Sequence, residues 1–197
     1  MSARWLEDSA KSRRVDGSFP ARDRIRAPGR AIDEGVGPTE HVVGFRDWRA
    51  IGGRLSSPHF PIWWDQPALG AECRRFRRAE DLLQAPHAAP DPECGCGIHA
   101  YYTPTSEFSK IDFRGVSGIV ALWGRIELHG DGMRAQHARV EALGLYARWS
   151  SRQKSAVKEI ATNLAVDLVD LRELGSAASR YGLLQVPAAA SLTTKTD

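Results

Sequence analysis

Long apolar runs and abundant cysteines are both missing from this chain of 197 residues. No run of about 18 apolar residues occurs, which excludes a typical membrane-crossing helix. Three cysteines are too few, and odd in number, for the disulfide framework of a small secreted protein. No apolar segment near the start has the form of a secretory leader. We therefore expect a cytoplasmic protein whose thiols are reduced.

Lysine is also scarce, because arginine outnumbers it 22 to 5. The formal net charge is only +3, which is too small to indicate a nucleic-acid binder by itself. Hydrophobic residues make up 42% of the chain, enough to bury one sizeable core. Composition therefore predicts one globular domain with a small net charge.

Familiar catalytic patterns are absent as well. The sequence has no glycine-rich loop of the kind that binds phosphates and no strong acid/base pair. It also has no histidine-rich metal site with a carboxylate at a recognisable spacing. These absences disfavour the common nucleotide hydrolases and metallohydrolases. They favour a binding or accessory module.

The chain divides into three parts. Residues 1–40 mix Arg, Asp, Gly, Pro and Ser without apolar periodicity, which predicts a disordered arm. Residues 41–184 are expected to form a single globular domain. Residues 185–197 are expected to form a flexible tail.

Apolar patterning predicts the elements of this domain. An extended segment around Val42–Trp48 should stop at Gly52-Gly53, and a hairpin should turn at His129–Gly132. Strands are further expected at 98–102, 116–129 and 133–143, a short helix at 68–83, and a possible strand at 165–169.

The C-terminal part is predicted to be helical. Val157, Ile160, Ala161 and Leu164 follow the spacing of an amphipathic helix that starts near Arg152. Asp170 and Glu173 have the spacing of a capping box for a second helix, which Gly182 would end. The expected fold class is α+β: a small twisted antiparallel sheet, or a partly open β-barrel, with two C-terminal helices.

The densest chemistry lies in Cys94-Gly-Cys96-Gly-Ile-His99. With Cys73, these residues give three thiols and one imidazole, a ligand set that suits tetrahedral zinc. We take Cys73, Cys94, Cys96 and His99 as the candidate metal ligands. His87 or His59 could replace His99.

Two other interpretations of this segment stay open. The glycines and cysteines could simply form a tight turn into a strand, with Cys73 packed as a small apolar residue. Alternatively, Cys96 could be a nucleophile that His99 or His129 activates.

Two segments resemble a family of bacterial proteins to which no activity is assigned. The likeness covers most of residues 45–184. In that family tyrosine is more frequent at the position of His99, so the resemblance implies that the three cysteines act together. The residues that carry it are Cys94–Ala100, Trp123-Gly124, His129, Gly132, Arg134-Ala135 and Ala138.

Two further groups could bind an anion. Trp123, Arg125, His129 and Arg134 surround the predicted hairpin and could form an aromatic and cationic site. Arg74 and Arg77 could contact phosphates. The plainer alternatives are that Trp123 is core and that the arginines form a solvated face.

The sequence thus favours a cytoplasmic binding or accessory module for an anionic ligand. That ligand would be a nucleotide or other small anion, a nucleic acid, or an acidic protein surface. The cysteine cluster would brace the fold, with zinc as the one cofactor considered. The alternative is a hydrolase-like enzyme that uses Cys96 with a nearby histidine, or a metal-bound water.

Overall fold

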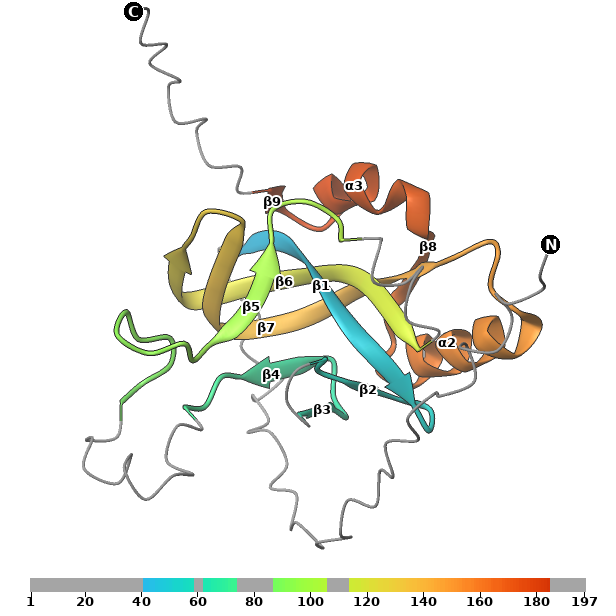
Figure 1. Ribbon diagram of the computed structural model, residues 1–197. Coiled ribbons are helices and arrows are strands. Elements are labelled where there is room, and N and C mark those ends of the chain that lie inside the picture. Colours follow the sequence, from blue (N-terminus) through green and yellow to red (C-terminus); the bar gives the residue numbers. More distant parts are fainter. Residues whose placement is uncertain (1–40, 59–61, 74–86, 106–113, 185–197) are drawn as a thin grey trace, which may run out of the picture.

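The computed structural model describes residues 41–58, 62–73, 87–105 and 114–184. Within these ranges the chain has a mixed α+β fold, with a sheet of nine strands and two α-helices (Figure 1). The sheet is larger than the small sheet expected from the sequence. The predicted arm at 1–40 and the predicted tail at 185–197 lie outside the described residues.

A long hairpin forms the centre of the sheet. Strands β6 (Gly115–Leu128) and β7 (Gly132–Leu145) pair antiparallel, and the turn between them lies where the sequence predicts it. The register shifts between Trp123 and Ile126, where Gly124 has a φ of +77°. Glycine adopts this left-handed conformation without steric cost, so the bulge falls naturally at this residue.

Strand β1 (Val42–Ile51) lies along β6, antiparallel, from the pair Val42–Leu122 to the pair Arg49–Gly115. It turns at Gly52-Gly53, as predicted, into β2 (Arg54–Ser56), which pairs in turn with β3 (Trp63–Trp64). This short antiparallel extension places Trp64 next to the core, where its ring meets Trp48 edge-on at 5.5 Å.

Strands β5 (Ile98–Tyr101) and β4 (Ala68–Gly70) both pair with β7. Because β5 also meets β1, strands β1, β6, β7 and β5 close a ring. One residue pair, Phe45–Tyr101, makes the β1–β5 junction, so we describe a ring rather than a barrel. The predicted helix at 68–83 is wrong at its start, since pairing with β7 makes residues 68–70 a strand. Residues 74–83 lie outside the described part.

Helix α2 (Ser151–Leu164) covers one face of the sheet (Figure 1). Ser150 caps its N-terminus in a capping box with Gln153, which satisfies two otherwise unpaired backbone donors. The predicted apolar stripe is the buried face. It packs into a core cluster with Trp48, Leu122 and their buried neighbours.

The opposite face is covered by three short turns: η3 (Leu171–Glu173), α3 (Leu174–Ala177) and η4 (Ala178–Arg180). They lie between strands β8 (Asp167–Asp170) and β9 (Leu183–Leu184). Leu171 and Leu174 bury themselves there against Ile119 and Phe45. The expected second helix is thus broken into three short turns.

Strands β8 and β9 pair parallel, with β7 and β1 respectively, so the sheet is not wholly antiparallel. A β6 strand covered on both faces explains its almost continuous apolar run. In the described ranges, no helix combines the length and apolarity needed to cross a membrane.

A buried carboxylate lies in β1. Asp47 accepts hydrogen bonds from the hydroxyls of Thr105 and Ser117, each at 2.6 Å. Burial raises the pKa of Asp47 above its usual 3.8, although both hydroxyls and Arg46 act in the opposite direction. The native state therefore holds this proton more tightly than the unfolded chain does.

We predict a pH-dependent difference between the wild type and Asp47→Asn. As pH rises above about 4, the unfolded chain loses the Asp47 proton first, so the wild type loses stability relative to the variant. Urea unfolding of both proteins from pH 4 to 7 measures this difference. Asp65→Asn, at an exposed carboxylate, is the control. A difference that is constant with pH, or that favours the wild type as pH rises, contradicts the prediction.

Candidate metal centre

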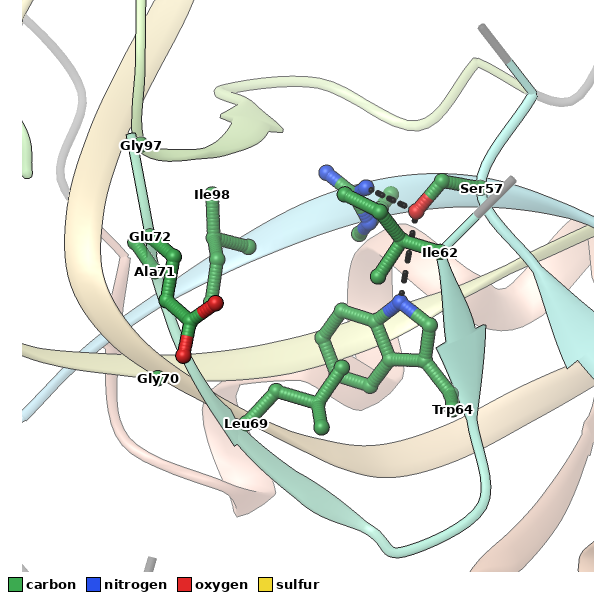
Figure 2. Close-up of a pocket in the computed structure, with 10 residues that line it drawn as sticks. Ser57, Ile62, Trp64, Leu69, Gly70, Ala71, Glu72, Gly97 and Ile98 are labelled. Carbon is green, nitrogen blue, oxygen red and sulfur yellow. Dashed lines mark hydrogen bonds between the residues drawn. The ribbon is translucent and has the colours of Figure 1, made fainter. Parts of the chain in front are cut away.

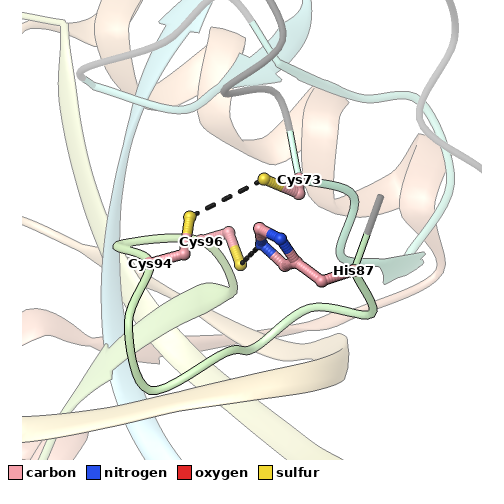
Figure 3. Close-up of side chains that lie close together, drawn as sticks. All are labelled: Cys73, His87, Cys94 and Cys96. Atoms are coloured by element: carbon pink, nitrogen blue, oxygen red, sulfur yellow. Dashed lines mark hydrogen bonds between the residues drawn. The ribbon is translucent and has the colours of Figure 1, made fainter. Parts of the chain in front are cut away.

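Three thiols and one imidazole converge beside the sheet. The Sγ atoms of Cys73, Cys94 and Cys96 and a ring nitrogen of His87 all lie within 4.8 Å of one another. Figure 3 shows the sulfur of Cys73 directed at that of Cys94, and the His87 ring directed at the sulfur of Cys96. These residues are compatible with a bound metal ion, since thiolate and imidazole are the usual ligands of structural metal sites.

Two distances within the group match those of a tetrahedral ion. The Sγ atoms of Cys73 and Cys94 are 3.7 Å apart, and Cys96 Sγ is 3.4 Å from His87 Nε2. Zn–S bonds of about 2.3 Å and Zn–N bonds of about 2.05 Å at tetrahedral angles place two sulfurs about 3.8 Å apart, and sulfur and nitrogen about 3.6 Å apart. All three cysteines are free thiols, and 3.7 Å is far longer than a disulfide bond.

The local structure of residues 91–97 presents two of these thiols together. Cys94 pairs with Asp91 in an isolated bridge, and the Asp91 carboxylate accepts a hydrogen bond from the Glu93 amide at 3.0 Å. Gly97 then takes a φ of +119°, and a Cβ there would approach Pro90 and Arg134 to 3.1 Å. A side chain at this position would be strained, so glycine at position 97 is a structural requirement of the turn.

Arg134 of β7 holds this turn against the sheet. Its side chain is only 7% exposed, and it donates to the carbonyl oxygens of Cys94 and, at 3.2 Å, of Cys96. The same guanidinium pairs with Glu127 at 2.6 Å and donates to His129 Nε2 at 2.8 Å. Arg134 was expected to face an anionic ligand. Instead it is buried, and its donors are engaged within the protein.

The thiols of the group differ in acidity. Burial opposes ionisation of Cys94, but hydrogen bonds from the Cys96 amide, from both neighbouring thiols and from His87 outweigh it and lower its pKa to about 7. Burial, together with the hydrogen bond and charge of Cys94, raises the pKa of Cys96 to about 12. One thiol of the group therefore ionises readily, and ionisation of a second thiol is unfavourable. A bound cation would remove that resistance, because metal-bound thiols are deprotonated.

His99 is not a member of the group. As a residue of β5 it is exposed, and its Nε2 lies 3.2 Å from the carbonyl oxygen of Gly95. The alternation of side chains along β5 explains this, because Ile98 and Ala100 are buried and His99 must point the other way. His87 provides the imidazole instead, and His59 lies outside the described residues.

Each of the other predicted ligand residues that the structure describes contacts a residue of the protein itself. Trp123 stacks on His137, with centroids 5.6 Å apart and an interplanar angle of 27°. Arg125 donates to the carbonyl oxygen of Pro90 at 3.3 Å, and His129 accepts from Arg134. Arg74 and Arg77 lie outside the described residues.

A small cavity of about 50 Å³ adjoins the cysteine group. The residues that line it include Glu72, which precedes Cys73, and Gly97, which follows Cys96. Figure 2 shows Ser57, Ile62 and Trp64 on one side of it, and Glu72, Leu69 and Ile98 on the other. Arg46 completes the lining. Sequence reasoning missed this cavity, since its residues come from five separate segments and share no motif.

We predict that Arg134→Lys destabilises the protein by about 2 kcal/mol or more, because lysine cannot reproduce the planar set of donors to the loop carbonyls and Glu127. Urea unfolding measures the loss. Arg139→Lys is the matched control, since Arg139 lies on the same strand but is 40% exposed and pairs with Glu141 near the surface. It should cost less than about 0.5 kcal/mol. Equal losses in the two variants contradict this role for Arg134.

Comparison with known proteins adds nothing to this geometry. No protein-family model, no curated protein and no solved structure matches the chain significantly. What the group of Cys73, His87, Cys94 and Cys96 can do therefore follows from its own chemistry.

Proposed function

We propose that this chain is a cytoplasmic binding module for an anionic ligand, and that zinc bound by Cys73, His87, Cys94 and Cys96 braces its fold. One observation carries the proposal. Four soft donors, from three segments, lie within 4.8 Å of one another, and the Cys73–Cys94 and Cys96–His87 distances match those of a tetrahedral site.

The donor set favours a structural rather than a catalytic ion. Three thiolates and one imidazole fill the four positions of tetrahedral zinc, whereas catalytic zinc keeps one position open for water. The ion would join the end of the β4 segment to the loop that precedes β5. It would close a chain segment of about 20 residues, which limits the freedom of the unfolded chain.

An anionic ligand is supported by one arginine in the cavity lining rather than by net charge. Arg46 lines the cavity beside the cysteine group. No ion-pair partner for Arg46 is found among the residues that the structure describes. Its charge is therefore available for a bound group.

A thiol nucleophile is the alternative function, and one distance favours it. Cys96 Sγ is 3.4 Å from His87 Nε2, within reach of a base. However, the pKa of Cys96 is raised to about 12, chiefly by burial. Two more cysteine sulfurs also crowd the same place. These features suit metal binding better than nucleophilic attack.

Metal analysis tests the proposal. We expect one equivalent of zinc in the purified chain, and a cobalt-substituted protein with the intense visible bands of tetrahedral cobalt bound to thiolates. Chelation should lower stability by roughly 3 kcal/mol, or about 10 °C in Tm, because it releases the loop. Far-UV circular dichroism should largely persist, since none of the four ligands belongs to either hydrophobic core cluster. Metal-free protein with one fast-reacting thiol would instead support the nucleophile.

Variants of His87 and His99 test which of the two histidines binds the metal. His87→Ala should weaken zinc binding by about 10-fold to 100-fold or more, because it removes one of four ligands. His99→Ala should leave zinc affinity unchanged. Competition with a chromophoric chelator measures both affinities. The assignment fails if His99→Ala weakens binding as much as His87→Ala.

A further inference from the structure

Arg46, which forms no ion pair within the described residues, lines the cavity next to the cysteine group. Arg46 donates to the carbonyl oxygen of His99 and, at 3.0 Å, to the hydroxyl of Ser57. Its Nε atom is buried and has no hydrogen-bond partner. Burial lowers the pKa of Arg46 to about 10, with Tyr101 and Asp47 opposing the shift, so the group still carries its charge at neutral pH.

A carboxylate is the complement of a guanidinium, because two oxygens accept from its planar fork at once. The terminal nitrogens of Arg46 already donate to His99 and Ser57, so a carboxylate in the cavity would meet the charge of the guanidinium and share these donors. The neighbouring Ser57 hydroxyl adds a second polar group on the same wall, where it accepts from the Trp64 indole at 3.4 Å. The wall therefore combines one cation with one hydroxyl.

The rest of the cavity is apolar. Trp64, Leu69 and Ile98 are all buried, and they face the space together with the half-buried Ile62 (Figure 2). A volume of about 50 Å³ has room for roughly three or four water-sized groups. Such a space fits a short carbon chain and excludes a nucleotide base with its sugar.

Charge also limits the ligand. Among the lining residues that the structure describes, Arg46 is the single basic one, and Glu72 lies on the side opposite Ser57 (Figure 2). A second negative charge on the ligand would meet Glu72 without a cation to balance it. Phosphate dianions, polyphosphates and nucleic acids are therefore poor matches for this cavity.

We propose that the Arg46 cavity binds a small organic monocarboxylate, with the carboxylate on Arg46 and the carbon chain against Trp64 and Leu69. This inference rests on the proposed function, because it names the ligand class and the site of that binding module.

Butyrate titrated into the zinc-loaded full-length chain tests the site, with the indole N–H resonance of Trp64 as the NMR reporter. We expect saturable binding with a dissociation constant on the order of 1 mM, a value typical of so small a ligand. Butyramide, which has the same shape without the charge, should bind at least about 10-fold more weakly. Equal binding of butyrate and butyramide overturns the proposal.

Arg46→Gln should weaken butyrate binding about 10-fold or more. Arg49→Gln is the matched control, since it makes the same charge change on the same strand but does not line the cavity; it should bind like the wild type. If Arg46→Gln fails to fold, Arg46→Lys keeps the charge, and it should still weaken binding several-fold by losing the planar fork. Unchanged affinity in the folded Arg46 variants overturns the proposal.

These results separate the two levels of inference. If inorganic phosphate or a nucleotide binds the wild type and the Arg46 variants equally well, the cavity assignment is wrong and the anion-binding module stands. If neither butyrate nor these anions bind, both the cavity assignment and the anionic ligand are wrong. Zinc content, measured on the same samples, shows whether the metal centre is occupied.

Discussion

The candidate metal centre depends on a buried arginine. Arg134 reaches from the middle of the sheet into residues 91–97 and satisfies their carbonyl oxygens, while Glu127 compensates its charge. A buried charge is tolerable only when it is paired and hydrogen-bonded in this way. The loop can therefore turn sharply, and the turn places the Cys94 and Cys96 thiols opposite Cys73 and His87.

Arg134 and Arg46 differ in the hydrogen-bond acceptors that surround them. Arg134 is enclosed by acceptors that the chain supplies, so it fixes structure and offers nothing to a ligand. Within the described residues Arg46 donates to a carbonyl and a hydroxyl, with Trp48 and Trp64 near its guanidinium. The contrast shows that residue type alone does not reveal which arginine is held by the protein itself. Burial and the supply of acceptors decide which cation is available, and both depend on tertiary packing.

Local sequence patterns predict those elements whose structure depends mainly on neighbouring residues. The β6–β7 hairpin and helix α2 follow from alternation, a glycine turn and a 3.6-residue period. The sequence also predicts the three cysteines as metal ligands, because thiols are a ligand type that suits tetrahedral zinc. Strand β4 was missed, since only pairing with β7 makes residues 68–70 extended. The sequence predicts His99 as the ligand and His87 only as its substitute, because a nearby sequence position does not show which way a strand directs a side chain.

The cysteine group and the Arg46 cavity share backbone at two places. Glu72 adjoins Cys73, and Gly97 adjoins Cys96, so each of these segments contributes to both. If the metal ion and the cavity ligand favour the same arrangement of those segments, each raises the binding affinity of the other. The factor is the same whichever binds first. Occupancy of the cavity would then be reported by the rate and affinity of metal exchange. A chelator would act as an antagonist of the ligand without entering its site.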